Sequence, residues 1–441
     1  DIASELVDDQ GNRLLPEAYD ESKWAKAAAA AKDVIELNRY TLFVSYATDK
    51  GDIAFPATIA PPYHPEFSEQ AWPNGWKDID PFESYRAIFN GTVSAFENKE
   101  LIFTRGQNTG DQSINNMVIH QLPRVAKGWN THGLTQKQCD AYYMNDGTDC
   151  PGKDKEINRG DGSERMSGYV TKEDVEAGRY KPLSEGVSLQ YANREPRFYA
   201  SVAYNGDVWN LLNSNKNAGE PQNIQVFYYR GDGNGYTNSM FWLRTGIGVK
   251  KFVHPNDMGK GDNNEELIKK KVEPAIRYAE VLLIYAEALN ELEDGSSYDI
   301  PSWDGSTSYS VKRDVDEMKK GIRQVRRRAG VPDYTMPEYQ DRDVFRKKLK
   351  RERQIELMAE GQRYFDLRRW KDAEVEESKK NYGCNFYMSD VEEQREQFYT
   401  PIEIADLPTA FSRKLYFWPI SHDELKRNKR LTQNPGWTYN D

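Results

Sequence analysis

The chain has 441 residues, of which 38% are hydrophobic and 12% aromatic, and its formal net charge is −10. An acidic chain repels nucleic acids and anionic membrane surfaces, so neither is expected as a partner. No apolar run approaches the ~20 residues that cross a bilayer, and the chain opens on Asp1–Ser4 without a basic-then-apolar targeting signal.

The first predicted element is a helix from Glu21 to Leu37, with Ser22 as its expected N-cap. Apolar residues recur there at spacings of three and four, as on one face of a helix, at Trp24, Ala27, Ala28, Ala31 and Ile35. Alanine, the strongest helix former, fills much of this segment. The face is expected to pack against another helix.

Residues 40–265 differ in composition, because Gly, Asn, Asp and Pro are frequent and apolar runs are short. Runs such as Glu100–Thr104 and Arg197–Tyr204 indicate a few short strands within a loop-rich, ligand-facing portion. The segment Gly231–Gly235 is interpreted as an exposed turn, since it lacks the strand and helix that flank phosphate loops. Leu243 stands where a calcium loop needs a bidentate Glu.

Three cysteines and five histidines limit the redox and metal chemistry. Cys139 and Cys150 lie eleven apart in one polar loop, so a single bridge between them and two free thiols are both open alternatives. Cys384 is isolated in sequence, as is each histidine. We expect neither a metal site nor a cofactor.

Residues 274–373 carry the strongest helical pattern. Pro274 is expected to open a long helix that continues to Glu293 with two adjacent apolar stripes. Another helix follows from Val315 to Ala329, ended by Gly330 and Pro332, and further helices are expected over 343–360 and up to Trp370. Small residues and short connections are typical of tetratricopeptide-like helix pairs. The fold prediction is a mostly α-helical protein in which residues 21–38 and 274–373 form the helix-pair scaffold, 374–441 an irregular carboxy-terminal segment, and 1–441 one body.

Residues 312–371 contain 19 basic and 11 acidic residues, a local excess that could bind nucleic acid. Glu352 and Glu356 lie four residues apart with Arg351 and Arg353 interleaved. Ion pairs on solvated faces or between helices are therefore the preferred interpretation.

Enzyme motifs are missing. The sequence holds neither the G-x-S-x-G turn of a serine hydrolase nor a G-x-x-x-x-G-K-[ST] phosphate loop. Paired carboxylates for glycoside hydrolysis stay open as an alternative, because their separation is spatial rather than sequential. The expectation is a binding protein, not an enzyme.

Aromatic residues in the loops suggest a saccharide site, where flat rings stack on the C–H faces of sugars beside amide and carboxylate groups. Trp209 is the preferred candidate, because the turn at Gly206–Asp207 is expected to expose its ring. The full set of predicted ligand-binding residues is Trp209, Asn205, Asp207, Tyr63, Trp72, Trp76 and Trp129.

Several segments in this order resemble the SusD/RagB family of surface glycan-binding lipoproteins. They include Asn193–Ala200, which is similar to the family's R-[DE]-P-R-F signature, and the run from Arg351 through Gly361 to Trp370. The others are Asn98–Phe103, Leu134–Gly147, Ile276–Ala288, Phe417–Ile420 and Gln433–Trp437.

The resemblance implies a helix-pair fold on the extracellular face of a Bacteroidetes outer membrane. There, family members cap a SusC-like TonB-dependent transporter and deliver oligosaccharides, or in some cases peptides, without doing chemistry. Signature residues such as Arg194, Arg197, Arg353 and Asp366 then have structural roles. Family members begin with a lipid-bearing cysteine and further helices, so the resemblance implies that an amino-terminal portion with the membrane anchor is absent from this chain.

Overall fold

The computed structural model describes residues 18–47, 59–105, 113–153, 165–213, 223–237, 240–259, 267–405 and 409–438. The helices are α1 Ser22–Glu36, α2 Pro81–Arg86, α3 Ile114–Gln121, α4 Gln136–Ala141, α5 Lys172–Glu176, α6 Pro196–Ser201, α7 Tyr278–Asn290, α8 Val315–Arg328, α9 Met336–Gln340, α10 Arg342–Glu356, α11 Gln362–Arg369, α12 Ala373–Glu376, α13 Glu392–Phe398 and α14 His422–Arg427. The strands are β1 Ser45–Tyr46, β2 Ile79–Asp80, β3 Leu101–Arg105, β4 Val202–Ala203, β5 Asp207–Asn210, β6 Asn223–Val226, β7 Gly248–Val249, β8 Glu273–Arg277, β9 Ser297–Pro301, β10 Ser308–Lys312, β11 Tyr382–Gly383 and β12 Ile402–Glu403. This composition confirms the mostly helical fold with a few short strands.

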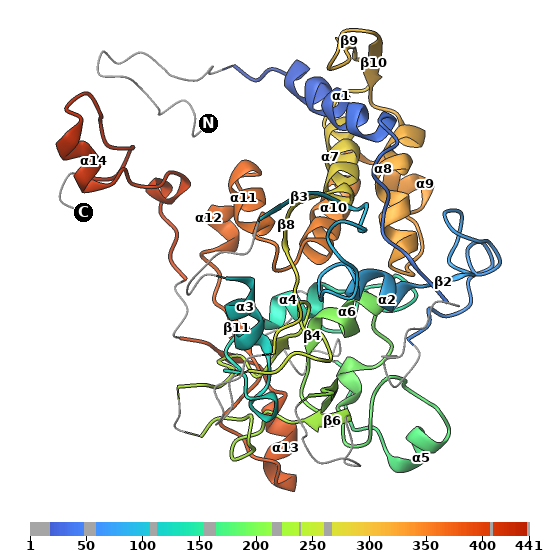
Figure 1. Cartoon of the computed structure of the whole chain (residues 1–441), viewed down its shortest axis with the longest axis vertical. Coiled ribbons are helices and arrows are strands. Elements are labelled where there is room, and N and C mark those ends of the chain that lie inside the picture. Colours follow the sequence, from blue (N-terminus) through green and yellow to red (C-terminus); the bar gives the residue numbers. More distant parts are fainter. Residues whose placement is uncertain are drawn as a thin grey trace.

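Helices α1, α7, α8 and α10 form one packed layer, with α7 in contact with each of the other three (Figure 1). The alanine-rich face of α1 is fully buried at Ala25 and Ala28. Gly321 of α8 allows a close helix crossing, because an added Cβ would lie 2.5 Å from the Leu282 carbonyl oxygen of α7. Small residues thus set the spacing of this scaffold.

Two predicted helix starts are wrong. Glu21 occupies the N-cap of α1, while Ser22 is already helical and its hydroxyl donates to Asp20. Pro274 lies in β8 instead of opening a helix, and α7 begins at Tyr278. The reason is that β3 supplies an antiparallel partner, with Thr104 opposite Pro274, and local helical periodicity does not reveal such a partner.

The middle of the chain consists of long connections, short helices and two-stranded sheets (Figure 1). The run Glu100–Thr104 contributes β3, as expected, and the segment around Gly231–Gly235 is a turn. The run Arg197–Tyr204 differs from the expectation, because most of it is helix α6 and only Val202–Ala203 is a strand. Pro196 occupies the first turn of α6, where its fixed φ favours a helix.

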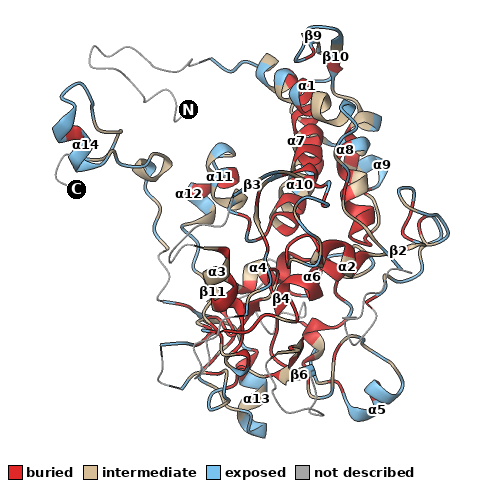
Figure 2. Ribbon diagram, viewed as in Figure 1, coloured by how far each residue is buried: buried red, intermediate tan, exposed pale blue. Residues whose placement is uncertain are grey.

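Two large hydrophobic cores hold these parts together, and Figure 2 shows the buried residues concentrated in α7, α8 and α10 and in the middle of the molecule. One core lies between the scaffold helices and includes Leu282, Ile322 and Phe345. The other joins the loop-rich portion to the end of α10 through Ile355 and Met358. Within the described ranges, no helix is both long and apolar enough to cross a bilayer.

Buried ion pairs connect the scaffold to the loop-rich portion. Glu356 of α10 pairs with Arg197 of α6, Arg277 of β8 and Arg328 of α8. Glu352 accepts from Arg197 and Arg326 at 2.6 and 2.7 Å. The expected inter-helix ion pairs are therefore present, and at Glu352 and Glu356 they are buried rather than solvated. We call these residues the charge network.

The signature residues named from the sequence have structural contacts. Arg194 donates to the backbone carbonyls of Cys139 and Tyr142, and Arg353 forms a two-point ion pair with Asp366. Each arginine fixes a loop or a helix by charge-assisted hydrogen bonds, which is the role that the family resemblance implied.

Candidate functional site: an aromatic surface on the loop-rich portion

The seven predicted binding residues fall into three separate groups in the structure. Tyr63, Trp72 and Trp76 belong to the segment before α2, Asn205, Asp207 and Trp209 surround the start of β5, and Trp129 follows α3. The described contacts do not bring these groups together.

Trp209 does not have the exposed ring that its turn suggested, since only 3% of the residue is accessible. The turn at Gly206 leads directly into β5, where Trp209 lies opposite Ile224 of β6. Alternate residues of this strand point into the core, so Asp207 and Trp209 are both buried. The predicted exposure of Trp209 is therefore wrong.

The polar side chains near Trp209 form hydrogen bonds and an ion pair within the protein. The Asn205 side chain accepts from the Tyr228 backbone and donates to the Tyr399 hydroxyl. Asp207 forms a 2.5 Å ion pair with Lys250. Burial raises the pKa of Asp207 to about 6, although Lys250 acts in the opposite direction. These groups hold β5 in place instead of facing solvent.

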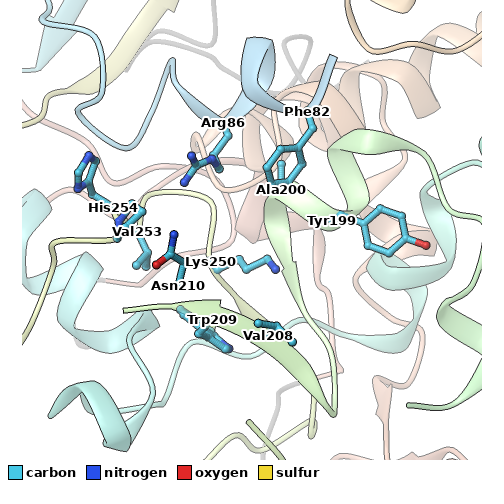
Figure 3. A pocket seen from close by; sticks show the side chains of 11 residues that line it. Phe82, Arg86, Tyr199, Ala200, Val208, Trp209, Asn210, Lys250, Val253 and His254 are labelled. Carbon is cyan, nitrogen blue, oxygen red and sulfur yellow. The ribbon is translucent and has the colours of Figure 1, made fainter. Parts of the chain in front are cut away.

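A cavity of about 40 Å³ adjoins Trp209, and its lining comes from α2, α6, β5 and the segment after β7 (Figure 3). Arg86, Asn210 and His254 give it polar walls. Ligand pockets commonly measure ~300–1,000 Å³, so this one accommodates water rather than a sugar ring.

In the first group, only Tyr63 is largely exposed, at 70%. Trp76 is buried against Phe67, and its indole donates to the Ser68 hydroxyl. Trp72 is half-buried between two apolar clusters. The two tryptophans therefore stabilise the loop, and Tyr63 is the member of this group that could reach a ligand.

Trp129 is the predicted tryptophan that lies on the surface, 40% exposed. Its ring lies beside Phe241, which is 38% exposed, with centroids 5.8 Å apart and planes inclined at 32°. Next in the chain, Trp242 contacts Tyr236 and Phe386, and Tyr236 also contacts the exposed Tyr387. Trp129, Phe241 and Tyr387 are exposed, whereas Trp242 and Phe386 are buried. We call the six residues Trp129, Tyr236, Phe241, Trp242, Phe386 and Tyr387 the aromatic surface.

Polar groups border these rings. The Arg244 guanidinium lies 4.3 Å from the Trp242 ring centroid. Arg124 donates to Gly233 and Thr237 in the same loop as Tyr236. Exposed rings next to hydrogen-bonding side chains are the combination that sugar recognition requires.

Two loops meet to build this surface, and an asparagine from each fastens them. Asn130 donates from its side chain to the Asn234 carbonyl at 2.7 Å, and the Asn234 side chain accepts from the Arg124 backbone at 2.8 Å. Gly235 lets the second loop turn tightly on itself, since a Cβ there would collide with the Tyr229 carbonyl oxygen. The positions of Trp129 and Tyr236 are thereby linked.

Two histidines lie behind Trp129. His120 contacts the Trp129 ring edge-on at 4.5 Å and stacks on His132 at 5.0 Å. Burial, with the nearby His120, lowers the pKa of His132 to about 4, and burial also lowers the pKa of His120. Both imidazoles are neutral near pH 7, so the support of Trp129 carries no charge there.

Sequence reasoning found Trp129 but missed Tyr236, Phe241, Trp242, Phe386 and Tyr387. A signal was present, because three aromatic residues fall within Tyr236–Trp242 directly after a turn rich in Gly and Asn. Their approach to Trp129 joins segments more than a hundred residues apart, which sequence spacing does not reveal.

The three cysteines are all buried. Cys139 and Cys150 form no disulfide, so the bridge considered between them is not formed. The Cys150 thiol instead donates to the Asp140 carbonyl. In the part of the chain that the structure describes, no group of three or more His, Cys, Asp and Glu side chains is placed to hold a metal.

Comparisons with known proteins agree with this architecture. The protein BT4246 has a TM-score of 0.68 and 21% identity, over 97% of this chain and 66% of its own. The Bacteroides fragilis SusD-like protein BF3747 has a TM-score of 0.55 and 24% identity, and the match covers 81% of this chain and 57% of BF3747. The B. fragilis SusD-like carbohydrate binding protein BF0978 has a TM-score of 0.55 and 20% identity, and the match covers 93% of this chain and 62% of BF0978. The chain thus spans less than two thirds of the length of each.

No curated protein matches the chain. The family model does, because the model of the SusD family matches residues 99–437, which include most of the scaffold helices and the whole aromatic surface. That match covers well over half of the sequence. The chain belongs to the SusD family.

Proposed function

We propose that this protein is a surface glycan-binding protein that captures oligosaccharides on the aromatic surface. The observation that carries this proposal is the exposed pair Trp129 and Phe241, in chain segments that also carry Arg124 and Arg244. Aromatic rings that keep a face in water stabilise sugars by stacking, and adjacent donors select among hydroxyl groups. The related BF0978 is described as a carbohydrate binding protein, which supports the same ligand class.

The proposal includes capture without catalysis. Burial raises the pKa of several described carboxyl groups. They include Asp232, near Asp390, and Asp207, which is 1% exposed and paired with Lys250. The adjoining cavity is too small for a sugar ring. Asp207 therefore does not meet a saccharide.

We further propose that the protein acts at the extracellular face of an outer membrane and passes its ligand to a TonB-dependent transporter of the SusC type. Family membership supports this assignment. Co-purification of such a transporter with the tagged protein from native membranes is the expected result, and recovery of the protein alone under mild detergent would contradict it.

Calorimetric titration against a panel of neutral oligosaccharides and peptides, with product analysis of each mixture, tests the ligand class. We expect binding of at least one oligosaccharide without any change in its chain length. Binding of peptides alone would replace the ligand class with oligopeptides. Shortened saccharide products would show a glycoside hydrolase instead.

A further inference from the structure

A second and larger cavity lies away from the aromatic residues, among α4, α10, α11 and α12. Its volume is about 340 Å³, within the range of small-ligand pockets. The described residues that line it include seven lysines and arginines against three carboxylates, an excess of four positive charges. The whole chain has a net charge of −10, so the positive charge of this pocket is opposite in sign to the net charge of the protein.

Several of these cations are already held by the protein. Lys137 pairs with Glu376, and Lys350 pairs with Asp372 at 2.7 Å. Arg351 donates to the Ala141 carbonyl at 2.7 Å and lies over the Tyr143 ring. These contacts fix the walls of the pocket in advance of any ligand.

The carboxylate at the centre of these contacts is fully charged near neutral pH. Burial would raise the pKa of Glu376, but hydrogen bonds from Lys137 and Lys379 outweigh it and lower the pKa to about 2. Glu376 is therefore a fixed anion that holds lysines on the wall, and protonation does not release them under ordinary conditions.

Two other cations remain available. Arg363 approaches the carboxylate of Glu376 only to 3.9 Å, makes no hydrogen bond to a described residue, and keeps about a third of its side chain (34%) exposed. Lys347 is exposed on α10 and has no ion pair within the described ranges. Burial lowers the pKa of Arg363 more than the nearby carboxylates raise it. The attraction of these carboxylates therefore does not compensate for the partial desolvation of the guanidinium.

We propose that this basic pocket is a second binding site, which takes a sulfate or carboxylate group of an acidic saccharide through Arg363 and Lys347. The planar guanidinium of Arg363 offers two parallel donors that match the oxygens of either group. The volume admits a charged sugar unit rather than the oxyanion alone. The saccharide part of this assignment rests on the proposed function, whereas the oxyanion part does not.

Titration with matched pairs of ligands tests the pocket. The probes are inorganic sulfate, a sulfated oligosaccharide with its desulfated parent, and an oligogalacturonate with its methyl ester. The pocket variant is R363Q/K347Q in the full chain. The control is K23Q/K26Q on the exposed face of α1, which removes the same charge, and the thermal midpoints of both variants show whether the fold is retained.

We expect the charged member of at least one pair to bind the unmodified protein about tenfold more tightly than its neutral counterpart, and less so at high salt. In R363Q/K347Q this advantage and the binding of sulfate should fall by about tenfold or more, while K23Q/K26Q should keep both. An unchanged advantage in a folded R363Q/K347Q, or neither sulfate binding nor any advantage in the unmodified protein, would overturn the assignment. Failure of neutral glycans to bind would instead concern the aromatic surface, because inorganic sulfate tests the pocket by itself.

Discussion

At the residue scale, the junction beneath the aromatic surface depends on a buried asparagine in an unusual conformation. Asn130 has φ of 52° and is 1% exposed, and its side chain donates to the Asn234 carbonyl. Asparagine is among the residues that best tolerate a left-handed backbone, and its amide also provides the link between the two loops. One residue thus serves both the turn and the contact between loops.

Replacement Asn130→Gly keeps the turn accessible and removes only the side-chain hydrogen bond. We expect a loss of about 1–2 kcal/mol in the free energy of unfolding, measured by urea denaturation, because a buried acceptor loses its donor. Asn193→Gly is the matched control, since Asn193 also has a positive φ of 53° but is exposed. If the two variants lose the same free energy of unfolding, the Asn130–Asn234 hydrogen bond between the loops contributes nothing to stability.

Which aromatic residues reach the surface could be predicted only in part from the sequence. Trp129 was identified as a candidate, and it is exposed. Trp209 follows a turn as well, yet β6 supplies a strand partner that directs its ring inward. Exposure depends on such distant partners, and for the same reason the contact between Trp129 and Phe241 was not predictable.

At the element scale, α10 links the scaffold to the loop-rich portion. Its apolar residues Phe345 and Leu349 pack in the helical core, whereas Ile355 belongs to the other core. Its glutamates form the charge network with α6, β8 and α8. The i, i+4 spacing of Glu352 and Glu356 was visible in the sequence, but their burial depends on arginines from three other elements.

Replacement Glu356→Gln is expected to reduce the free energy of unfolding by about 3–5 kcal/mol, because three buried arginines, Arg197, Arg277 and Arg328, each lose one of their carboxylate partners. Urea denaturation near pH 7 measures this loss. The control is Glu176→Gln, which removes the exposed pair with Lys172 and should change stability by less than about 1 kcal/mol. A loss as small as that of the control would contradict the role given to the charge network.

The same residue gives the expected pH dependence. Burial would raise the pKa of Glu356, but Arg328, Arg277 and Arg197 outweigh it and hold the pKa well below its usual range. The stabilisation is therefore present above the ordinary glutamate pKa near ~4.5 and is lost as the pH falls below it, because the unfolded chain then binds more protons. In the Glu356→Gln variant, stability should fall less steeply below pH ~4.5 than in the unmodified protein.

At the scale of the whole molecule, the helical fold class and the protein family were predictable from the sequence. Helical periodicity and the order of the family motifs are both visible in the sequence itself. The match over residues 99–437 and the similarity to BT4246 confirm the fold class and the family. The division into one scaffold and one ligand-facing portion stays a prediction. The basic pocket was not predictable, because α4 and α12 reach α10 only through tertiary packing.

The two proposed binding regions would bind saccharides through different interactions. The aromatic surface offers stacking and neutral hydrogen bonding, while the basic pocket offers fixed positive charge. A saccharide with both neutral and acidic units would engage them through different physical forces, and salt would weaken only the second. Their contributions are therefore separable by substitution and by ionic strength.

The most direct test of the central claim is the affinity of the double variant Trp129→Ala/Phe241→Ala for the best neutral oligosaccharide, measured by calorimetry. Trp303→Ala is the control, because Trp303 is highly exposed on the β9–β10 hairpin, on the far side of the scaffold (Figure 1). We predict a loss of affinity of about tenfold or more in the double variant, which is ~1.4 kcal/mol, because both stacking rings are removed. We predict no loss in the control. Unchanged affinity in a folded double variant would contradict the claim that this surface captures glycans.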